Sequence, residues 1–169
     1  AVKQNILCWL AAILSSSIFF FIMYSAGLYM EAYLQIFYIL MALYGWSQWR
    51  AKELPLFVGT WQLSSHLKAL GLILFLSLTS GYILDIYTDA ALPFFDALTT
   101  WGAVVATYMV AKKLIENWIY WFAIDFISIF LFLSRDLFLT ALLFAGYLVI
   151  IVFGYRAWKL SMLETKKGI

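Results

Sequence analysis

Long apolar runs dominate this chain and limit what it can fold into. A helix that crosses a bilayer core needs about 20 predominantly apolar residues. Six stretches approach that length, at roughly 6–24, 28–49, 67–84, 91–110, 115–133 and 137–158. Only 12% of the 169 residues are charged, whereas an ordinary soluble domain has about 25%. The sequence therefore predicts an all-α polytopic membrane protein and excludes a soluble enzyme, a disordered protein or a nucleic-acid binder.

The residues that most often hold metals are scarce. The chain has one cysteine, Cys8, and one histidine, His66. A single cysteine cannot close an intramolecular disulfide or build a cysteine metal site, so we predict no metal and no cofactor. We expect Cys8 to pack as a small apolar side chain and His66 to be a solvated residue at the membrane boundary.

The stretch 50–66 is too polar to span the membrane and allows two interpretations. It can be an ordinary loop, or its apolar side chains can lie along the membrane surface. Those side chains are Leu54, Leu56, Phe57, Val58 and Trp61.

The basic residues fall almost entirely on one side when the six spans alternate across the membrane. That side holds Lys3, Arg50, Lys52, Lys68, Lys112, Lys113, Arg156, Lys159, Lys166 and Lys167, and the other holds Arg135. Lysine and arginine concentrate in cytoplasmic loops. We therefore predict a multi-pass membrane protein whose C-terminus is cytoplasmic.

Two parts of the chain resemble each other and face the same way. Asn5 and Trp9 align with Asn117 and Trp121. In the helix that follows, Leu28, Ala32, Tyr38, Gly45 and Trp49 align with Leu137, Ala141, Tyr147, Gly154 and Trp158. The offset between the copies changes by three residues within the first helix of each pair. Parallel repeats of this kind occur in transporters, where the substrate site lies at the repeat interface.

The second copy has a preceding helix, about 91–110, that the first copy lacks. We therefore expect a single transmembrane domain, 1–169, with a 3+1+3 architecture whose first helix is missing from this chain, leaving six spans. Its parts would be a first repeat at 1–50, a loop and linking helix at 51–90, a second repeat at 91–159 and a tail at 160–169.

Three acids, Glu31, Asp96 and Asp125, lie within predicted spans. A carboxylate at membrane depth is costly and usually marks a functional site. Helical spacing places Trp118, Trp121, Asp125 and Ser128 on one face. Because indole faces attract cations, this face suits a flat, positively charged ligand. Alternatively, the tryptophans belong to an interfacial aromatic belt.

A second polar face combines Glu31, Gln35 and Tyr38, whose counterparts are Thr140, Phe144 and Tyr147. Such asymmetry is expected if one ligand binds across a pseudo-symmetric pair, although hydrogen bonding between helices is an alternative. Close helix approach is expected at four glycines, Gly45, Gly102, Gly146 and Gly154.

The segment ENWIYWFAID carries the pattern aromatic-x-x-aromatic-x-x-x-Asp at Trp118, Trp121 and Asp125. With LFLTALLFAGYLVIIVFGYRAWK, LYMEAYLQIFYILMALYGW and ALPFFDALTTW, it makes the chain resemble the PnuC family of vitamin transporters. The resemblance implies a SWEET-like 3+1+3 fold and a homotrimer. It also implies facilitated uptake of nicotinamide riboside, which a cytoplasmic kinase traps by phosphorylation. Some members carry thiamine or riboflavin instead.

From this resemblance we predict a nicotinamide riboside facilitator of the bacterial inner membrane. Trp118 and Trp121 would stack on the substrate and Asp125 would recognise its charge. The path would be lined by Glu31, Gln35, Tyr38, Asn117, Ser128, Thr140 and Tyr147. Phosphorylated substrates should be excluded, because no basic residue lies within a span to balance a phosphate.

Three alternatives stay open. The first is a thiamine transporter of the same fold, which the glutamate in YMEAYLQ favours. The others are an intramembrane enzyme with Asp96 and Asp125 as a catalytic pair, and a membrane scaffold that transports nothing.

Overall fold

The computed structural model describes residues 1–25, 29–50, 57–87, 92–134, 136 and 138–167, apart from the side chains of 22, 23, 25, 29–33, 166 and 167. Its elements are α1 (Leu7–Ser25), α2 (Tyr29–Arg50), α3 (Leu63–Tyr87), α4 (Pro93–Ala111), α5 (Asn117–Leu133) and α6 (Phe138–Lys167). Each matches one predicted span. The chain is an all-α membrane protein, as its apolar runs indicate.

Within the described residues, three helices are long and apolar enough to cross a membrane: Leu63–Tyr87, Pro93–Ala111 and Phe138–Thr165. Two shorter apolar helices, Leu7–Phe21 and Asn117–Leu133, accompany them. The helix α6 has 30 residues, which is about 45 Å at 1.5 Å per residue. It therefore continues past the predicted span and carries its basic C-terminal end beyond an apolar core of about 30 Å.

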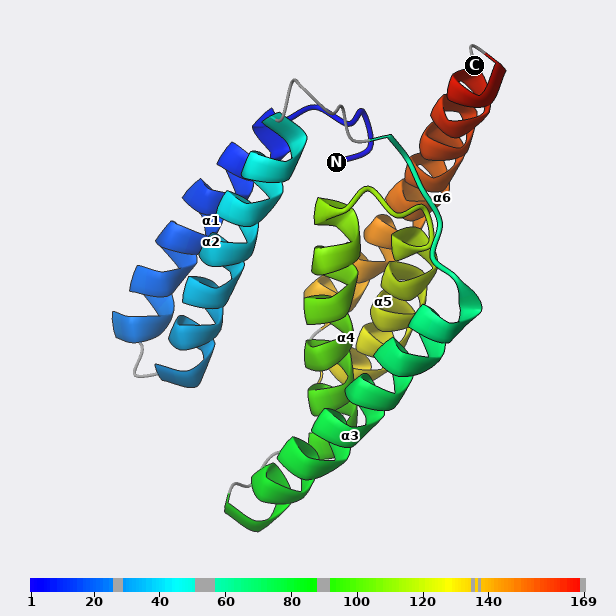
Figure 1. Cartoon of the computed structure of the whole chain (residues 1–169). Helices are drawn as coiled ribbons and strands as arrows, with labels where there is room; N and C mark the ends of the chain where they lie inside the picture. Colours follow the sequence, from blue (N-terminus) through cyan, green and yellow to red (C-terminus); the bar gives the residue numbers. More distant parts are fainter. Residues whose placement is uncertain (26–28, 51–56, 88–91, 135, 137, 168–169) are drawn as a thin grey trace.

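The helices pack as neighbouring pairs around α4. Backbone contacts join α1 with α2, α3 with α4, α4 with α5, and α5 with α6, and α2 also contacts α4. In Figure 1 the α1–α2 pair approaches the other helices at one end and diverges from them toward the other end. The first and second repeats therefore meet at the end where α2 finishes and α5 begins.

The same packing arrangement occurs in both repeats. In the first, the Trp9 ring lies against Gly45 and meets the edge of Trp49 at 5.4 Å and 83°. In the second, Trp118 lies against Gly154 and meets Trp158 at 5.5 Å and 88°. Each residue of the second set lies 109 positions after its counterpart.

This arrangement corrects the predicted alignment of the first helix of each repeat, because Trp9 corresponds to Trp118 and not to Trp121. The backbone before each helix agrees. Gln4 and Lys113, also 109 positions apart, adopt left-handed φ angles of 50° and 51°. The Gln4 N–H donates to the Ala1 carbonyl at 2.9 Å, and the Lys113 N–H donates to the Val110 carbonyl at 3.0 Å. One constant offset therefore relates the copies.

Close approach at glycine is confirmed at three of the four predicted positions. A Cβ at Gly45 or Gly154 would lie within 2.6 Å of a tryptophan ring, and one at Gly102 would lie 3.1 Å from Ile124. The prediction is wrong for Gly146, where an added Cβ would meet no atom of another described element within 4 Å. Gly81, which the sequence did not single out, permits contact with Phe94 instead.

The segment 57–62 is a loop that is held against the turn before α5. Gly59 forms an isolated parallel bridge with Leu114: its N–H donates to the Lys113 carbonyl at 3.1 Å, and its carbonyl accepts from Ile115 at 3.0 Å. Val58 is buried beside Ile115. The loop interpretation is therefore confirmed for residues 57–62, whereas the buried Val58 does not lie along the membrane surface; Leu54 and Leu56 lie outside the described residues.

Candidate functional site

The aromatic and acidic face of α5 is buried. Trp118, Asp125 and Ser128 are 6%, 3% and 4% exposed, and Trp121 is half-buried. An interfacial aromatic belt would leave its rings at the lipid headgroups. The burial of Trp118 contradicts that alternative for this residue, because its ring is enclosed by α6.

The contacts of Trp118 and Phe132, each seven residues from Asp125, show which way this face of α5 points. Trp118 packs on Gly154 of α6, and Phe132 lies 5.1 Å from Phe144 of α6. Asp125 lies halfway between Trp118 and Phe132, and residues seven apart share a helix face. Asp125 is therefore on the side of α5 that faces α6.

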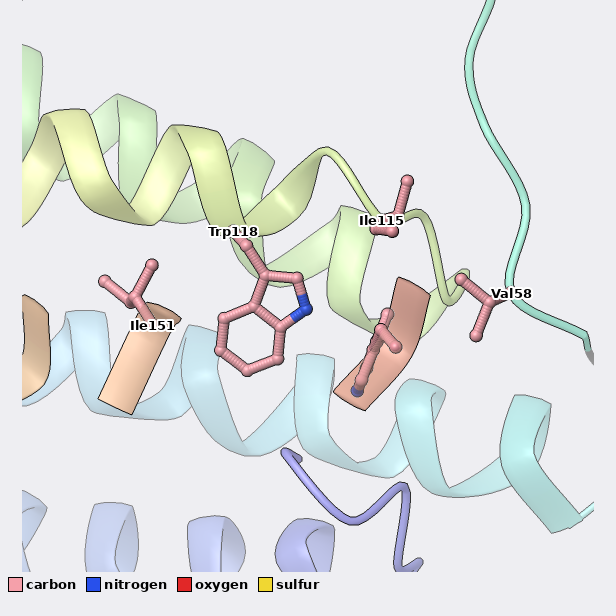
Figure 2. Close-up of a cluster of buried hydrophobic side chains, with 5 residues drawn as sticks. Val58, Ile115, Trp118 and Ile151 are labelled. Atoms are coloured by element: carbon pink, nitrogen blue, oxygen red, sulfur yellow. The ribbon is translucent and has the colours of Figure 1, made fainter. Parts of the chain in front are cut away.

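The upper part of this interface is an apolar cluster of Val58, Ile115, Trp118, Ile151 and Trp158, shown in Figure 2. Trp121 packs against the same cluster, so the two tryptophans of α5 lie together. Burial of aromatic rings supplies most of the apolar contact area in such a cluster. The cluster therefore fixes α5 against α6 in the helical turns that precede Asp125.

The carboxylate of Asp125 has no hydrogen bond or ion pair with the described residues. Its α5 neighbours supply indole rings and the hydroxyl of Ser128. A buried charge without a partner is unfavourable by several kcal/mol, and a cationic ligand removes that cost. The site therefore has the chemistry of a cation acceptor.

Asn117 is fully buried at the first residue of α5. Its Nδ2 donates to the Leu114 carbonyl, which leaves Oδ1 without a partner among the described residues. The indole Nε1 atoms of Trp9 and Trp118 are also buried without a described partner. Glu116 Oε2 is a second buried acceptor without a described partner, so the junction of the two repeats carries two such acceptors and two such donors.

The remaining predicted path residues belong to α2 and α6. Gln35, Tyr38 and Thr140 are half-buried, and Tyr147 is 41% exposed beside Phe144. Among the described residues, α2 makes no backbone contact with α5 or α6. The side chain of Glu31 lies outside the described residues. The role of these residues stays a prediction.

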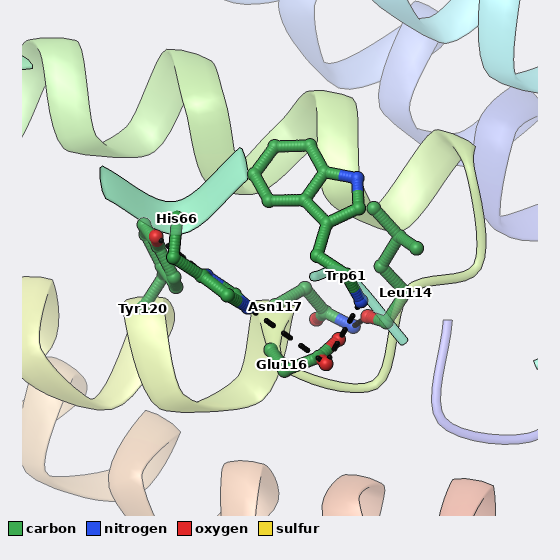
Figure 3. A network of polar contacts seen from close by, with 6 residues as sticks. All are labelled: Trp61, His66, Leu114, Glu116, Asn117 and Tyr120. Atoms are coloured by element: carbon green, nitrogen blue, oxygen red, sulfur yellow. Dashed lines mark hydrogen bonds and ion pairs between the residues drawn. The ribbon is translucent and has the colours of Figure 1, made fainter. Parts of the chain in front are cut away.

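A polar network that the sequence did not indicate ties α3 to α5 (Figure 3). His66 Nδ1 lies 3.0 Å from the Tyr120 hydroxyl, and its Nε2 lies 3.8 Å from Glu116 Oε1. The same carboxylate accepts the Trp61 N–H at 3.0 Å. His66 is half-buried, so the prediction of a solvated residue is wrong. The partners are at least 50 positions apart, so no local pattern could reveal them.

Several basic side chains surround the end where the repeats meet. Lys112 Nζ donates to Gln48 Oε1 at 3.1 Å, and Lys113 Nζ lies 4.9 Å from the centre of the Trp49 ring. Burial lowers the pKa of the Lys113 ammonium. Arg156 and Lys159 line a groove beside Trp118. These basic residues therefore gather at one end of the bundle.

Comparison with known proteins identifies the family. The nicotinamide mononucleotide transporter family matches residues 1–160. Two proteins named nicotinamide riboside transporter PnuC, from Escherichia coli (strain K12) and Shigella flexneri, are each 23% identical over 175 residues, covering 86% of this chain and 73% of the relative.

The crystal structure of the vitamin B3 transporter PnuC has the same fold, with a TM-score of 0.72 at 20% identity. The match covers 96% of this chain and 75% of that chain. These relatives are transporters, so the catalytic alternative for Asp96 and Asp125 is rejected. Because the family match spans all but the last nine residues, the chain belongs to the nicotinamide mononucleotide transporter (PnuC) family of multi-pass inner-membrane transporters.

Proposed function

We propose that this protein carries nicotinamide riboside across the membrane by facilitated diffusion. The observation that carries the proposal is the buried, unpartnered carboxylate of Asp125 on the same α5 face as Trp121. Two relatives are named for this vitamin. The protein would work as a homotrimer with a path through each protomer.

The chemistry of the substrate matches this face. The nicotinamide ring of the riboside is flat and permanently cationic, so it can stack on an indole while its charge is balanced by a carboxylate. A cation over an aromatic face gains about 2 kcal/mol when both are desolvated. Trp121 would supply the ring and Asp125 the charge, with Trp118 fixing the helix that presents them.

Facilitated diffusion requires only that the site face each side in turn, so net flow follows the gradient of free vitamin. Phosphorylation in the cytoplasm would keep the free riboside low there and make uptake unidirectional. Arg50, Lys113 and Lys159 lie at one end of the bundle. Their positive charge supports a cytoplasmic location for that end and for the C-terminus.

The family is described by the mononucleotide, but the residues around Asp125 favour the riboside, which has no phosphate. A phosphate beside Asp125 would be repelled by its carboxylate. The described spans carry no basic side chain at that level, since the cations gather near the ends of the helices. Thiamine is also flat and cationic, so the α5 face fits it as well, and it is the second candidate.

Transport by the full chain in proteoliposomes tests the proposal. Liposomes loaded with unlabelled riboside should take up labelled riboside by counterflow, and loading with the mononucleotide should not support exchange. Trp121→Ala and Asp125→Asn should strongly reduce counterflow at low riboside concentration, whereas Asp85→Asn, at an exposed acid of α3, should preserve it. If thiamine supported counterflow and riboside did not, thiamine would be the substrate. Wild-type rates in both α5 variants would remove the site.

A second arm tests trapping. Liposomes that contain a riboside kinase and ATP should accumulate label above the external concentration, and liposomes without the kinase should stop at equality. Accumulation without the kinase would contradict facilitated diffusion.

A further inference from the structure

A groove with a volume of about 480 Å³ runs between α5 and α6 and has no role in the proposed transport. Its use by a ligand would be independent of which vitamin the protein carries. The residues that matter for its chemistry are Ile119, Phe122, Val152, Tyr155, Arg156 and Lys159.

One end of the groove is cationic. Arg156 and Lys159 lie three residues apart on α6, so their side chains project from the same face. Both are exposed, and neither forms an ion pair with a described carboxylate. Lys159 Nζ lies 5.8 Å from the centre of the Tyr155 ring, which holds its stem against the helix. Two uncompensated positive charges therefore stand together at this end.

The rest of the groove is apolar and open. Ile119, Phe122 and Val152 line it and remain 44–59% exposed. Along α6, Val152 lies one turn from Arg156 in the direction away from the basic end of the bundle. The groove therefore has a cationic end followed by an apolar wall. A phospholipid has the matching order, with an anionic headgroup followed by acyl chains.

We propose that this groove binds an anionic phospholipid, with its phosphate between Arg156 and Lys159 and an acyl chain along Phe122 and Val152. Basic pockets between transmembrane helices commonly bind anionic headgroups. A second copy of the chain is a poorer occupant, because burying two unpaired cations would be unfavourable. A soluble phosphate would leave the apolar wall unused.

The first repeat provides a natural contrast. The counterparts of Arg156 and Lys159, 109 positions earlier, are Ser47 and Arg50. The Ser47 hydroxyl donates to the Tyr44 carbonyl of its own helix at 2.7 Å. The corresponding position of α2 therefore offers one cation instead of two, and we expect the second repeat to bind the anionic lipid more tightly.

Lipid binding by the delipidated full chain in dodecyl maltoside tests this proposal. Dioleoyl-phosphatidylglycerol and dioleoyl-phosphatidylcholine would be titrated separately, with bound lipid counted by native mass spectrometry and thermal unfolding followed in parallel. Phosphatidylglycerol should bind and raise the melting temperature more than phosphatidylcholine. Because each basic residue near a membrane surface contributes about 1 kcal/mol, Arg156→Gln/Lys159→Gln should weaken phosphatidylglycerol binding by roughly tenfold or more.

The matched control is Arg50→Gln/Lys68→Gln, which removes the same charge at the same end of the bundle from exposed positions. It should keep the preference for phosphatidylglycerol. Equal losses in the two double variants would show a general effect of surface charge and overturn the proposal, as would equal binding of both lipids by the wild type.

Two further arms test the apolar half. Val152→Phe leaves both cations in place and narrows the groove, so it should weaken phosphatidylglycerol binding while leaving the melting temperature without lipid unchanged. Glycerol 3-phosphate, which has the phosphate without acyl chains, should neither compete with the lipid nor raise the melting temperature. If it does so at comparable concentrations, the groove is a site for soluble phosphates and the lipid proposal is wrong.

Discussion

The α1–α2 and α5–α6 pairs are built on the same contacts but carry different chemistry. Each places a tryptophan of its first helix on a glycine of its second. One and two turns further along the first helix, the pair α1–α2 has Ala12 and Ser16 where α5–α6 has Trp121 and Asp125. The repeated residues maintain the scaffold, and the residues that differ are those to which we assign the proposed ligand chemistry.

The two repeats also contact each other through reciprocal hydrogen bonds. The Trp49 indole N–H donates to the Ala111 carbonyl before α5, and the Trp158 indole N–H donates to the Ala1 carbonyl before α1, each at 3.1 Å. Their rings lie 6.2 Å apart. Each repeat therefore supports the turn that leads into the other, which explains why tryptophan occurs at both positions.

Substitution of the contact glycines should have the largest effect and should be equal in the two repeats. Gly45→Ala and Gly154→Ala each place a Cβ within about 2.6 Å of an enclosed indole ring. Overpacking of this kind lowers the free energy of unfolding by about 1–3 kcal/mol. Thermal unfolding in detergent measures it, with Gly146→Ala as the control that should not destabilise. A large loss at one glycine and none at the other would break the equivalence of the repeats.

Removal of the Trp121 ring should separate the repeats by function. Trp121→Ala removes an interaction worth about 2 kcal/mol with a cationic ring, so riboside affinity should fall roughly thirtyfold. Trp121→Phe, which keeps an aromatic face, should lose much less. Counterflow over a range of riboside concentrations measures this. Equal losses for phenylalanine and alanine would show that the indole acts through packing alone.

The reciprocal tryptophans should give a smaller, matched pair of effects. Trp49→Phe and Trp158→Phe keep a ring in each contact but remove the hydrogen bond to the facing turn. Each should lower the free energy of unfolding by about 1 kcal/mol. Thermal unfolding again provides the measurement. A change at only one of the two would show that the support between the repeats is one-sided.

The smallest effect is expected at the link between α3 and α5, which has no described counterpart in α1–α2. Tyr120→Phe removes the hydroxyl that contacts His66 Nδ1. The loss should be about 0.5–1 kcal/mol. Hydrogen exchange should increase at Gly59 and Ile115 and stay unchanged at Gln4, in the turn before α1. Faster exchange at all three would mean a global loss of stability.

The sequence was sufficient for the helices and for the existence of a repeat. Their apolar length and the tryptophan and glycine pattern are local properties. The register of the first helices was missed because matching Asn5 with Asn117 gives a convincing short alignment, whereas packing against Gly45 and Gly154 depends on contacts across helices.

The shared face of α5 could be predicted from the sequence, whereas its role as a binding site stays a prediction. Helical spacing placed Trp118, Trp121 and Asp125 on one face without any tertiary information, and the structure shows that face turned toward α6. The environment of His66 was mistaken because its partners come from another helix. No periodicity along α3 encodes the position of Glu116 or Tyr120.

Calorimetric titration of riboside into wild-type protein and Asp125→Asn tests the central claim that the second repeat binds a cation with its buried carboxylate. Asparagine has a similar shape and no charge. Removing one partner of a buried charge pair costs at least about 2 kcal/mol of affinity, so riboside binding should weaken roughly thirtyfold or more. The melting temperature without ligand should stay the same or rise, since an unpaired buried carboxylate is lost. Unchanged riboside affinity in a folded Asp125→Asn protein would contradict the account.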